Sequence, residues 1–258
     1  GFDYSWSPDG KWFTLEFIGN RHDPYSDIGM VSAQGGKIIN LTNSGYTSGS
    51  PRWVLDGNAI LFITERYGMR AHASWGSLND VMLVFMNQDA YDKFRLSKED
   101  YELQKELEKE QKNTTEAKKN DKKKGDNKEK SEEKKEEKVK DIVVELNNIE
   151  DRIVRLTPNS SDLGSAIITK DGETLYYLSA FEGGYDLWKM NLRKKDTKLL
   201  HKMDAGWANM EMDKDGKNLF LLGSNTMQKM GTDSESLKPI SYQAHVKMDL
   251  AAERDYMF

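Results

Sequence analysis

Hydrophobic and polar residues alternate in a recurring unit along this chain. In four places an alternating run leads into an Asp-Gly pair, and a second alternating run rich in aliphatic and aromatic residues follows. The Asp-Gly pair favours a tight hairpin because Gly adopts positive φ at no steric cost, and such side chains suit a pleated sheet. We therefore predict four β-hairpins, which cover residues 4–17, 51–63, 165–178 and 209–222.

Further strand-like segments follow most of these hairpins in a constant order. Candidates for a third strand are residues 27–31, 80–85 and 185–190. Candidates for a fourth strand in the same units are residues 37–42, 152–157 and 197–201. Each unit is thus expected to hold four antiparallel strands.

The spacing of the Asp-Gly pairs indicates a repeat. The pairs begin at Asp9, Asp56, Asp171 and Asp215, with gaps of 47, 115 and 44 residues. A period of about 40–45 residues with four strands per unit is typical of a β-propeller. One such hairpin would fit any antiparallel fold, and an antiparallel sandwich is the alternative. The constant strand order favours an all-β, partial β-propeller of about four four-stranded blades.

The same spacing sets the expected domain boundaries. The blades are assigned to residues 3–43, 49–157, 160–202 and 205–243, and an insertion at 88–141 accounts for the long gap. The chain begins with Gly1 and ends abruptly, so we interpret it as part of a longer protein. Residues 244–258 are interpreted as a linker toward a missing downstream domain.

The insertion in the second blade is highly charged, and its residues 113–137 are nearly free of apolar side chains. From Ser97 to Asp141 it holds 15 Lys and 15 Asp or Glu in 45 residues. Ser97 with Asp100 resembles a capping box, and a helix over residues 98–111 is expected. Residues 113–137 are expected to be mobile or a lone solvated helix, because they cannot repay the entropy of ordering. Balanced charge favours a tolerated loop expansion over a partner-binding tail.

Composition argues against several function classes. The net charge of −5 argues against nucleic-acid binding, which needs a basic face. The chain contains no cysteine, so disulfides, thiolate catalysis and Cys-ligated zinc are absent. No stretch approaches the roughly 20 apolar residues of a membrane span.

Motifs that carry chemistry are also missing. The sequence holds no Gly-x-Ser-x-Gly elbow and no phosphate-binding glycine loop, and its histidines (His22, His72, His201 and His245) are scattered. We expect no catalytic residue, cofactor or metal. The strongest candidate site is a contact loop at a propeller face, with Arg70, His72, Ser74 and Trp75. A catalytic His72–Ser74 pair is the less favoured alternative.

Two further patterns allow a functional and a structural interpretation. Asp213-Lys-Asp215-Gly resembles the start of a calcium loop, but no Glu follows at the required distance, which favours a hairpin turn. Trp6, Trp53 and Trp207 each lie shortly before an Asp-Gly turn. They could stack on sugars, but we favour a place in the core between blades.

Several stretches resemble a known family. Trp6-Ser-Pro-Asp-Gly10, Asp27-Ile and Gly36-x₄-Leu41-Thr42 are similar to the blade motif of TolB and tricorn-type propellers. The stretches 74–82, 87–100 and 246–258 resemble tricorn-like bacterial serine peptidases. The resemblance covers nearly the whole chain outside the insertion.

The resemblance implies a role and a setting. In that family the propellers precede a PDZ domain and a catalytic core, which would place the nucleophile outside this chain. It implies a non-catalytic propeller segment that gates or guides peptide or unfolded polypeptide substrates, or scaffolds the protease. Its partners would be the remaining blades and the protease core, and its location the periplasm or cell envelope. A TolB-like binding module without a protease, and the propeller of a prolyl-oligopeptidase-type enzyme, are the alternatives.

Overall fold

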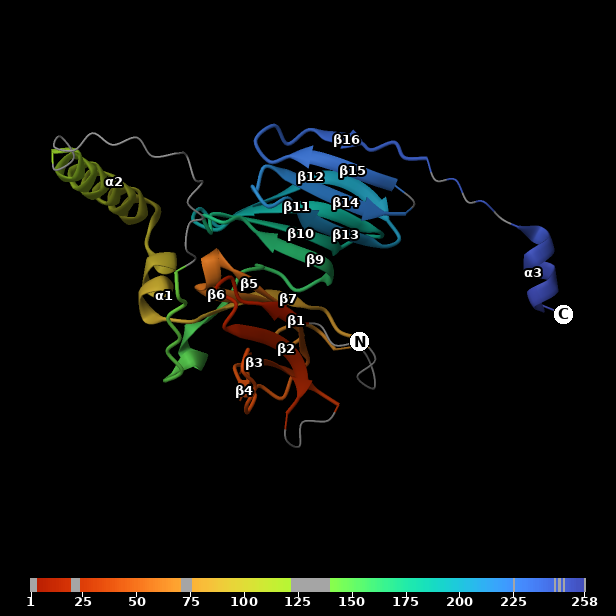
Figure 1. Cartoon of the computed structure of the whole chain (residues 1–258), viewed down its shortest axis with the longest axis horizontal. Coiled ribbons are helices and arrows are strands. Elements are labelled where there is room, and N and C mark those ends of the chain that lie inside the picture. Colours follow the sequence, from red (N-terminus) through yellow and green to blue (C-terminus); the bar gives the residue numbers. More distant parts are fainter. Residues whose placement is uncertain are drawn as a thin grey trace, which may run out of the picture.

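Four antiparallel sheets follow one another along the chain (Figure 1). The structure is a computed structural model that describes residues 4–19, 24–70, 76–121, 140–224, 226–243, 245, 247 and 249–257. Each sheet has four strands that keep the order of the sequence, and every neighbouring pair is antiparallel. The prediction of an all-β propeller of four four-stranded blades is therefore confirmed.

The strands of the first two blades lie close to the expected segments. Blade 1 consists of β1 (Tyr4–Trp6), β2 (Trp12–Ile18), β3 (Ser26–Ser32) and β4 (Ile39–Asn40). Blade 2 consists of β5 (Ser48–Val54), β6 (Ala59–Thr64), β7 (Asp80–Phe85) and β8 (Ile153–Arg155). The charged insertion lies between β7 and β8, so the second blade is completed by a strand that follows it in the sequence.

The last two blades have no insertion. Blade 3 consists of β9 (Asp162–Ile168), β10 (Thr174–Ala180), β11 (Tyr185–Asn191) and β12 (Asp196–Ala205). Blade 4 consists of β13 (Ala208–Met212), β14 (Asn218–Gly223), β15 (Thr226–Gly231) and β16 (Leu237–Pro239). The sequence pattern had not singled out β15 and β16 individually.

The Asp-Gly hairpins of blades 1 and 3 have the same pattern of hydrogen bonds. Ser7 Oγ donates to Asp9 Oδ1 at 2.6 Å, and the backbone N–H of Trp12 donates back to Ser7 Oγ at 2.9 Å. In blade 3, Thr169 Oγ1 donates to Asp171 Oδ1 at 2.6 Å, and the backbone N–H of Thr174 donates to Thr169 Oγ1 at 3.0 Å. Gly10 closes its turn at φ +67°, the left-handed region that Gly adopts without strain.

In blade 4, Asp213 occupies the position that Ser7 has in blade 1 and Thr169 has in blade 3. Its Oδ1 accepts the backbone N–H of Lys217 at 2.7 Å and that of Asn218 at 3.1 Å. Within the described residues, no group of three or more acidic or histidine side chains is arranged to hold a metal ion. The segment joins β13 to β14, which pair antiparallel, so its interpretation as a hairpin turn is confirmed.

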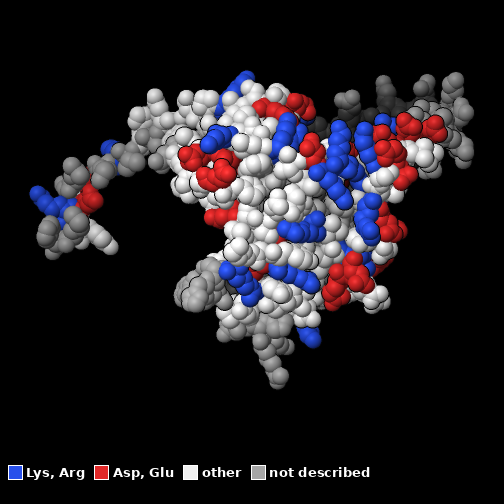
Figure 2. Space-filling view, turned by 180° about the vertical axis from the view of Figure 1, so that it is seen from behind, with Lys and Arg blue, Asp and Glu red and all other residues white. Residues whose placement is uncertain are grey.

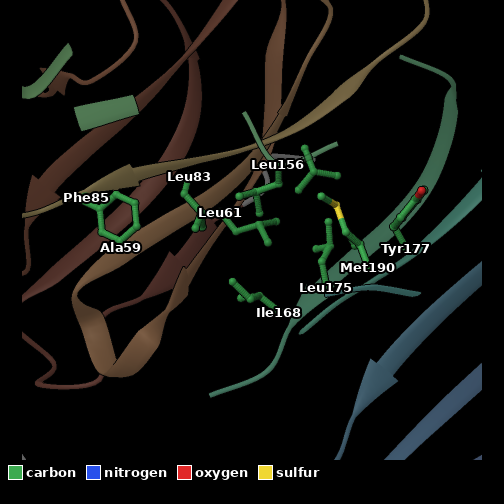
Figure 3. Close-up of a cluster of buried hydrophobic side chains, with 11 residues drawn as sticks. Ala59, Leu61, Leu83, Phe85, Leu156, Ile168, Leu175, Tyr177 and Met190 are labelled. Atoms are coloured by element: carbon green, nitrogen blue, oxygen red, sulfur yellow. The ribbon is translucent and has the colours of Figure 1, made fainter. Parts of the chain in front are cut away.

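Apolar clusters join each blade to the next. Ile28 and Met30 of blade 1 pack with Ile60, Phe62 and neighbouring side chains of blade 2. Figure 3 shows the second cluster, in which side chains of blade 2 meet Ile168, Leu175, Tyr177 and Met190 of blade 3. A third cluster joins blades 3 and 4. The blades therefore pack face against face in sequence order, as a propeller requires.

The expectation that three tryptophans fill the core between blades is wrong for two of them. Trp53 is partly buried and packs against the cluster between blades 1 and 2. Trp6 is 53% exposed and Trp207 is 50% exposed. Trp6 lies on the face of blade 1 that points away from blade 2, where its ring meets Phe13 edge-on at 4.7 Å. Trp6 and Trp53 both lie three residues before the Asp of their turn, yet of these two only Trp53 packs against a cluster between blades.

The insertion begins as an ordered helical arm. It contains α1 (Gln88–Arg95) and α2 (Lys98–Asp121), and it returns through a 3-10 helix (Ile149–Arg152). Ser97 Oγ accepts the N–H of Asp100 at 3.1 Å, as the capping pattern predicts. The helix α2 continues ten residues beyond the expected end at 111. The rest of the segment that was expected to be mobile or a lone helix, residues 122–137, lies outside the described residues.

Figure 1 shows α2 projecting from the blades and α3 (Leu250–Met257) standing away from them. Among the described residues, no helix is both long enough and apolar enough to cross a membrane.

Candidate functional site

The predicted contact loop joins β6 to β7 at one rim of blade 2. Its two arms are held together by an antiparallel bridge between Arg70 and Ser77 and by the bond from Leu78 N to Met69 O, at 3.0 Å. Arg70 is the candidate residue whose surroundings the structure describes. His72, Ser74 and Trp75 lie outside the described residues.

Arg70 joins loops from two blades. Its Nη2 donates to Glu65 Oε1 at 2.8 Å within the loop. Its guanidinium carbon lies 4.7 Å from the ring centroid of Tyr46 and 5.3 Å from that of Tyr25. Tyr25 lies just before β3 of blade 1, and Tyr46 lies in the link between β4 of blade 1 and β5 of blade 2, so cation–π contacts connect the rims of the two blades.

Glu65 organises the base of this cluster. It accepts hydrogen bonds from Ser77 Oγ at 2.6 Å and from the backbone N–H of Thr47 at 3.2 Å. Burial acts to raise the pKa of Glu65, but these bonds and the charge of Arg70 outweigh it and hold the pKa below its ordinary value. Glu65 is therefore a carboxylate at neutral pH, and its role is to orient Arg70.

Four residues bring an ion pair and two aromatic rings together at this rim. We name Arg70, Tyr25, Tyr46 and Glu65 the Arg70 cluster. His201 lies elsewhere: its Nε2 is 2.8 Å from the carbonyl oxygen of Glu235, beside blade 4. The Arg70 cluster thus combines an Arg–Glu ion pair with two aromatic rings, groups that can contact a partner by hydrogen bonding and stacking.

Sequence reasoning found Arg70 but missed Tyr25, Tyr46 and Glu65. The signal that could have found Tyr25 is its position relative to the strands of its blade. Tyr25 precedes β3 and Arg70 precedes β7, and these are the third strands of successive blades. Loops between second and third strands reach the same rim in every blade, so aligning the repeats would have placed Tyr25 and Arg70 at one rim. Tyr46 lies in the link between β4 and β5, and no repeat position points to its contact with Arg70.

The inner strands of the propeller leave little space between them. Residues of β5, β9 and β13 line a pocket of about 120 Å³. Arg52 Nη1 and Glu211 Oε1 form an ion pair across it at 3.2 Å, which joins blade 2 to blade 4. The described inner strands therefore form no wide passage at this point.

Charges of both signs cover the outside. Figure 2 shows that Lys and Arg side chains gather on the side of the arm, with Asp and Glu side chains among them. Between blades 3 and 4, Lys189 and Lys198 form ion pairs with Glu235 at 2.6 and 2.8 Å. Hydrogen bonds from these two lysines hold the pKa of Glu235 below its usual value.

Comparison with known structures shows a likeness in fold. The tricorn protease has a TM-score of 0.59 to this chain, at 10% identity over 93% of this chain and 22% of its own. TolB from Acinetobacter baumannii has a TM-score of 0.52, at 13% identity over 92% of this chain and 42% of its own. The fold is that of the tricorn and TolB propellers.

Two further comparisons concern peptidases. A solved structure of prolyl endopeptidases has a TM-score of 0.50 at 11% identity, over 94% of this chain and 28% of its own. The uncharacterized peptidase YuxL of Bacillus subtilis (strain 168) is 39% identical over 59 residues, which are 23% of this chain and 9% of that protein. The chain matches no known protein-family model. It therefore spans only a small part of the peptidases it resembles.

Proposed function

We propose that this chain is a non-catalytic propeller segment of a tricorn-like serine peptidase, in which it guides or gates peptide substrates or scaffolds the protease. The fold likeness to the tricorn protease over 93% of the chain carries this proposal. The short match to a peptidase of Bacillus subtilis supports it. In this proposal residues 244–258, which include α3, lead toward the downstream domain.

The contact surface of the segment is placed at the loop with Arg70, His72, Ser74 and Trp75. The Arg70 cluster supports this placement, because a loop of blade 1, the link between blades 1 and 2, and a loop of blade 2 bring an Arg–Glu ion pair and two rings to one rim. Guiding along that rim is favoured over passage through the axis, because the Arg52–Glu211 ion pair spans the space between the inner strands.

The test uses the full-length parent protein. Deletion of residues 1–243 should change the ratio of cleavage rates for an unfolded, carboxymethylated protein and for the same protein folded. Cleavage of a short chromogenic peptide serves as the control that the catalytic core is intact. An unchanged ratio with an intact core would contradict guiding and gating.

A TolB-like binding module with no protease attached is the second candidate. The likeness to TolB of Acinetobacter baumannii favours it. The coding sequence after residue 258 separates the two proposals. A PDZ-like domain and a nucleophilic Ser support the first, a nearby stop codon supports the second, and an α/β-hydrolase domain would indicate a prolyl-oligopeptidase-type enzyme.

A further inference from the structure

A groove runs along the outer edge of blade 2, beside the helical arm. Its volume is about 820 Å³, within the range of ligand-binding clefts. One wall is the end of α1 and the link to α2, the other is β8 with the residues that follow it, and the floor is the end of β11 and its turn. We name it the arm groove.

The arm groove exists because the arm is fixed to blade 3. Arg193 Nη1 donates to the carbonyl oxygens of Phe94 and Leu96, the latter at 3.1 Å. Its guanidinium carbon lies 3.9 Å from the ring centroid of Tyr101, a residue that is 7% exposed. Lys105 on α2 binds Glu173 of blade 3. The wall formed by α1 and α2 is therefore anchored to the blades at several points.

The arm groove is lined by basic side chains that lie above an apolar base. Phe94, Leu156, Met190 and Leu192 supply apolar surface. Arg95, Arg155, Arg193 and Lys195 supply the charge, and none of the described residues that line the groove is Asp or Glu.

Only one of these four cations is neutralised by a carboxylate within the described part of the chain. Arg155 pairs with Asp80 at 2.8 Å. Arg193 is instead bound by backbone carbonyls and aromatic rings, and Arg95 donates to Tyr91 Oη at 3.2 Å. The arm groove therefore carries a positive charge that its own lining does not balance.

One wall of the groove is also a sheet edge. β8 is the outermost strand of blade 2, and among the described strands it pairs only with β7. Along such an edge, alternate residues direct their N–H and C=O groups away from the sheet, and an extended peptide can pair with them. β8 has three residues, about 10 Å of strand, which suits a short contact.

We propose that the arm groove binds an extended peptide segment in which acidic and apolar residues alternate. Its backbone pairs with the free edge of β8, its carboxylates face the basic residues, and its apolar side chains rest on the base. This goes beyond the proposed function, because it holds whether or not a peptidase core follows the chain.

The test measures fluorescence anisotropy of a labelled peptide with three Val-Glu repeats, added to the whole chain. It should bind at least tenfold more tightly than a peptide with three Val-Lys repeats, and a rise in salt concentration should weaken binding. A peptide with three Pro-Glu repeats keeps the charge but lacks alternate N–H groups, and it should bind several-fold more weakly. Equal binding of the Pro-Glu and Val-Glu peptides would overturn the pairing with β8.

Paired substitutions locate the site. The double variant Arg95→Glu with Lys195→Glu should weaken binding of the Val-Glu peptide at least tenfold, and the milder Arg95→Gln with Lys195→Gln should give a smaller loss. The matched control is Lys229→Glu with Lys238→Glu on blade 4, which changes the net charge equally and should leave affinity within twofold. Equal losses in both charge-reversed variants, or no binding to the unaltered chain, would overturn the proposal.

Discussion

The carboxylate of Asp80 accepts a hydrogen bond from the hydroxyl of Thr157 at 2.9 Å, across 77 positions of sequence. In blade 1, Asp27 accepts the equivalent bond from Thr42 at 2.8 Å across 15 positions. Each bond ties the start of a third strand to the end of a fourth. The charged arm therefore enters blade 2 without disturbing the contact that closes it.

Replacing Asp80 should destabilise the chain strongly. Asp80 is fully buried and also accepts bonds from Arg155 Nε at 3.0 Å and Ser160 Oγ at 2.7 Å. Asp80→Ala leaves several donors without an acceptor, so we expect the free energy of unfolding to fall by about 2–3 kcal/mol. Urea denaturation measures it, with Asp233→Ala on the surface as the control. A loss no larger than that of the control would show that this contact does not close the blade.

The anchoring of the arm by Arg193 can be tested separately. Arg193→Met removes the bonds to the arm's carbonyls while keeping apolar length, and Arg193→Lys keeps the charge but loses the planar fork. Both variants should raise hydrogen exchange across residues 88–110 several-fold and leave blades 1 and 4 unchanged. Arg52→Met also replaces an arginine by methionine but removes the ion pair with Glu211 instead of a contact with the arm, and it serves as the control. Unaltered exchange in the arm would mean that its helices are held by other contacts.

Gly68 is required by a close approach of two backbone segments in the contact loop. A Cβ atom at this position would lie 1.7 Å from the carbonyl oxygen of Leu78. Gly68→Ala must shift the loop, so we expect the melting temperature to fall by several degrees, which corresponds to about 1–3 kcal/mol. Gly206→Ala meets its nearest atom at 4.0 Å and should have little effect. Equal melting temperatures would show that the loop relaxes freely.

Glu65 predicts a pH dependence of stability. Its pKa is lowered in the folded state, so the stability it contributes is present above the unfolded pKa, about 4.3, and is lost as pH falls through the folded value. Glu65→Gln should lower the free energy of unfolding by about 1 kcal/mol at pH 7, and by less near pH 3. Urea denaturation at both pH values measures this, with Glu182→Gln as the control. The same loss at both pH values would contradict the ionised role of Glu65.

The outer face of blade 1 predicts self-association of this chain when it is expressed by itself. Tyr4 is 66% exposed and Trp6 is 53% exposed, and Phe13 lies beside them. An unpaired apolar blade face favours poor solubility or pairing with a second copy. Sedimentation velocity should show species larger than the monomer, which Tyr4→Ser with Trp6→Ser reduces. A stable monomer of the unaltered chain would refute this expectation.

Much of the fold could be predicted because its determinants are local. The turns depend on residues within a few positions, such as Asp9 beside Gly10, and the strands depend on alternation. The environments of Trp6 and Trp207 could not be predicted in this way. Whether a side chain is buried depends on which blade face lies opposite it, and that is decided only when the sheets pack.

The candidate sites, like the fold, were determined partly by the sequence and partly by the tertiary structure. The sequence by itself determined four hairpins, their order, the charged insertion and Arg70 as a candidate. Only the tertiary structure decided that Tyr25 and Tyr46 from blade 1 flank Arg70, that Arg193 fixes the arm, and that a basic groove lies beside β8. These contacts join residues far apart in the chain, and their energies depend on distances in space that no local pattern encodes.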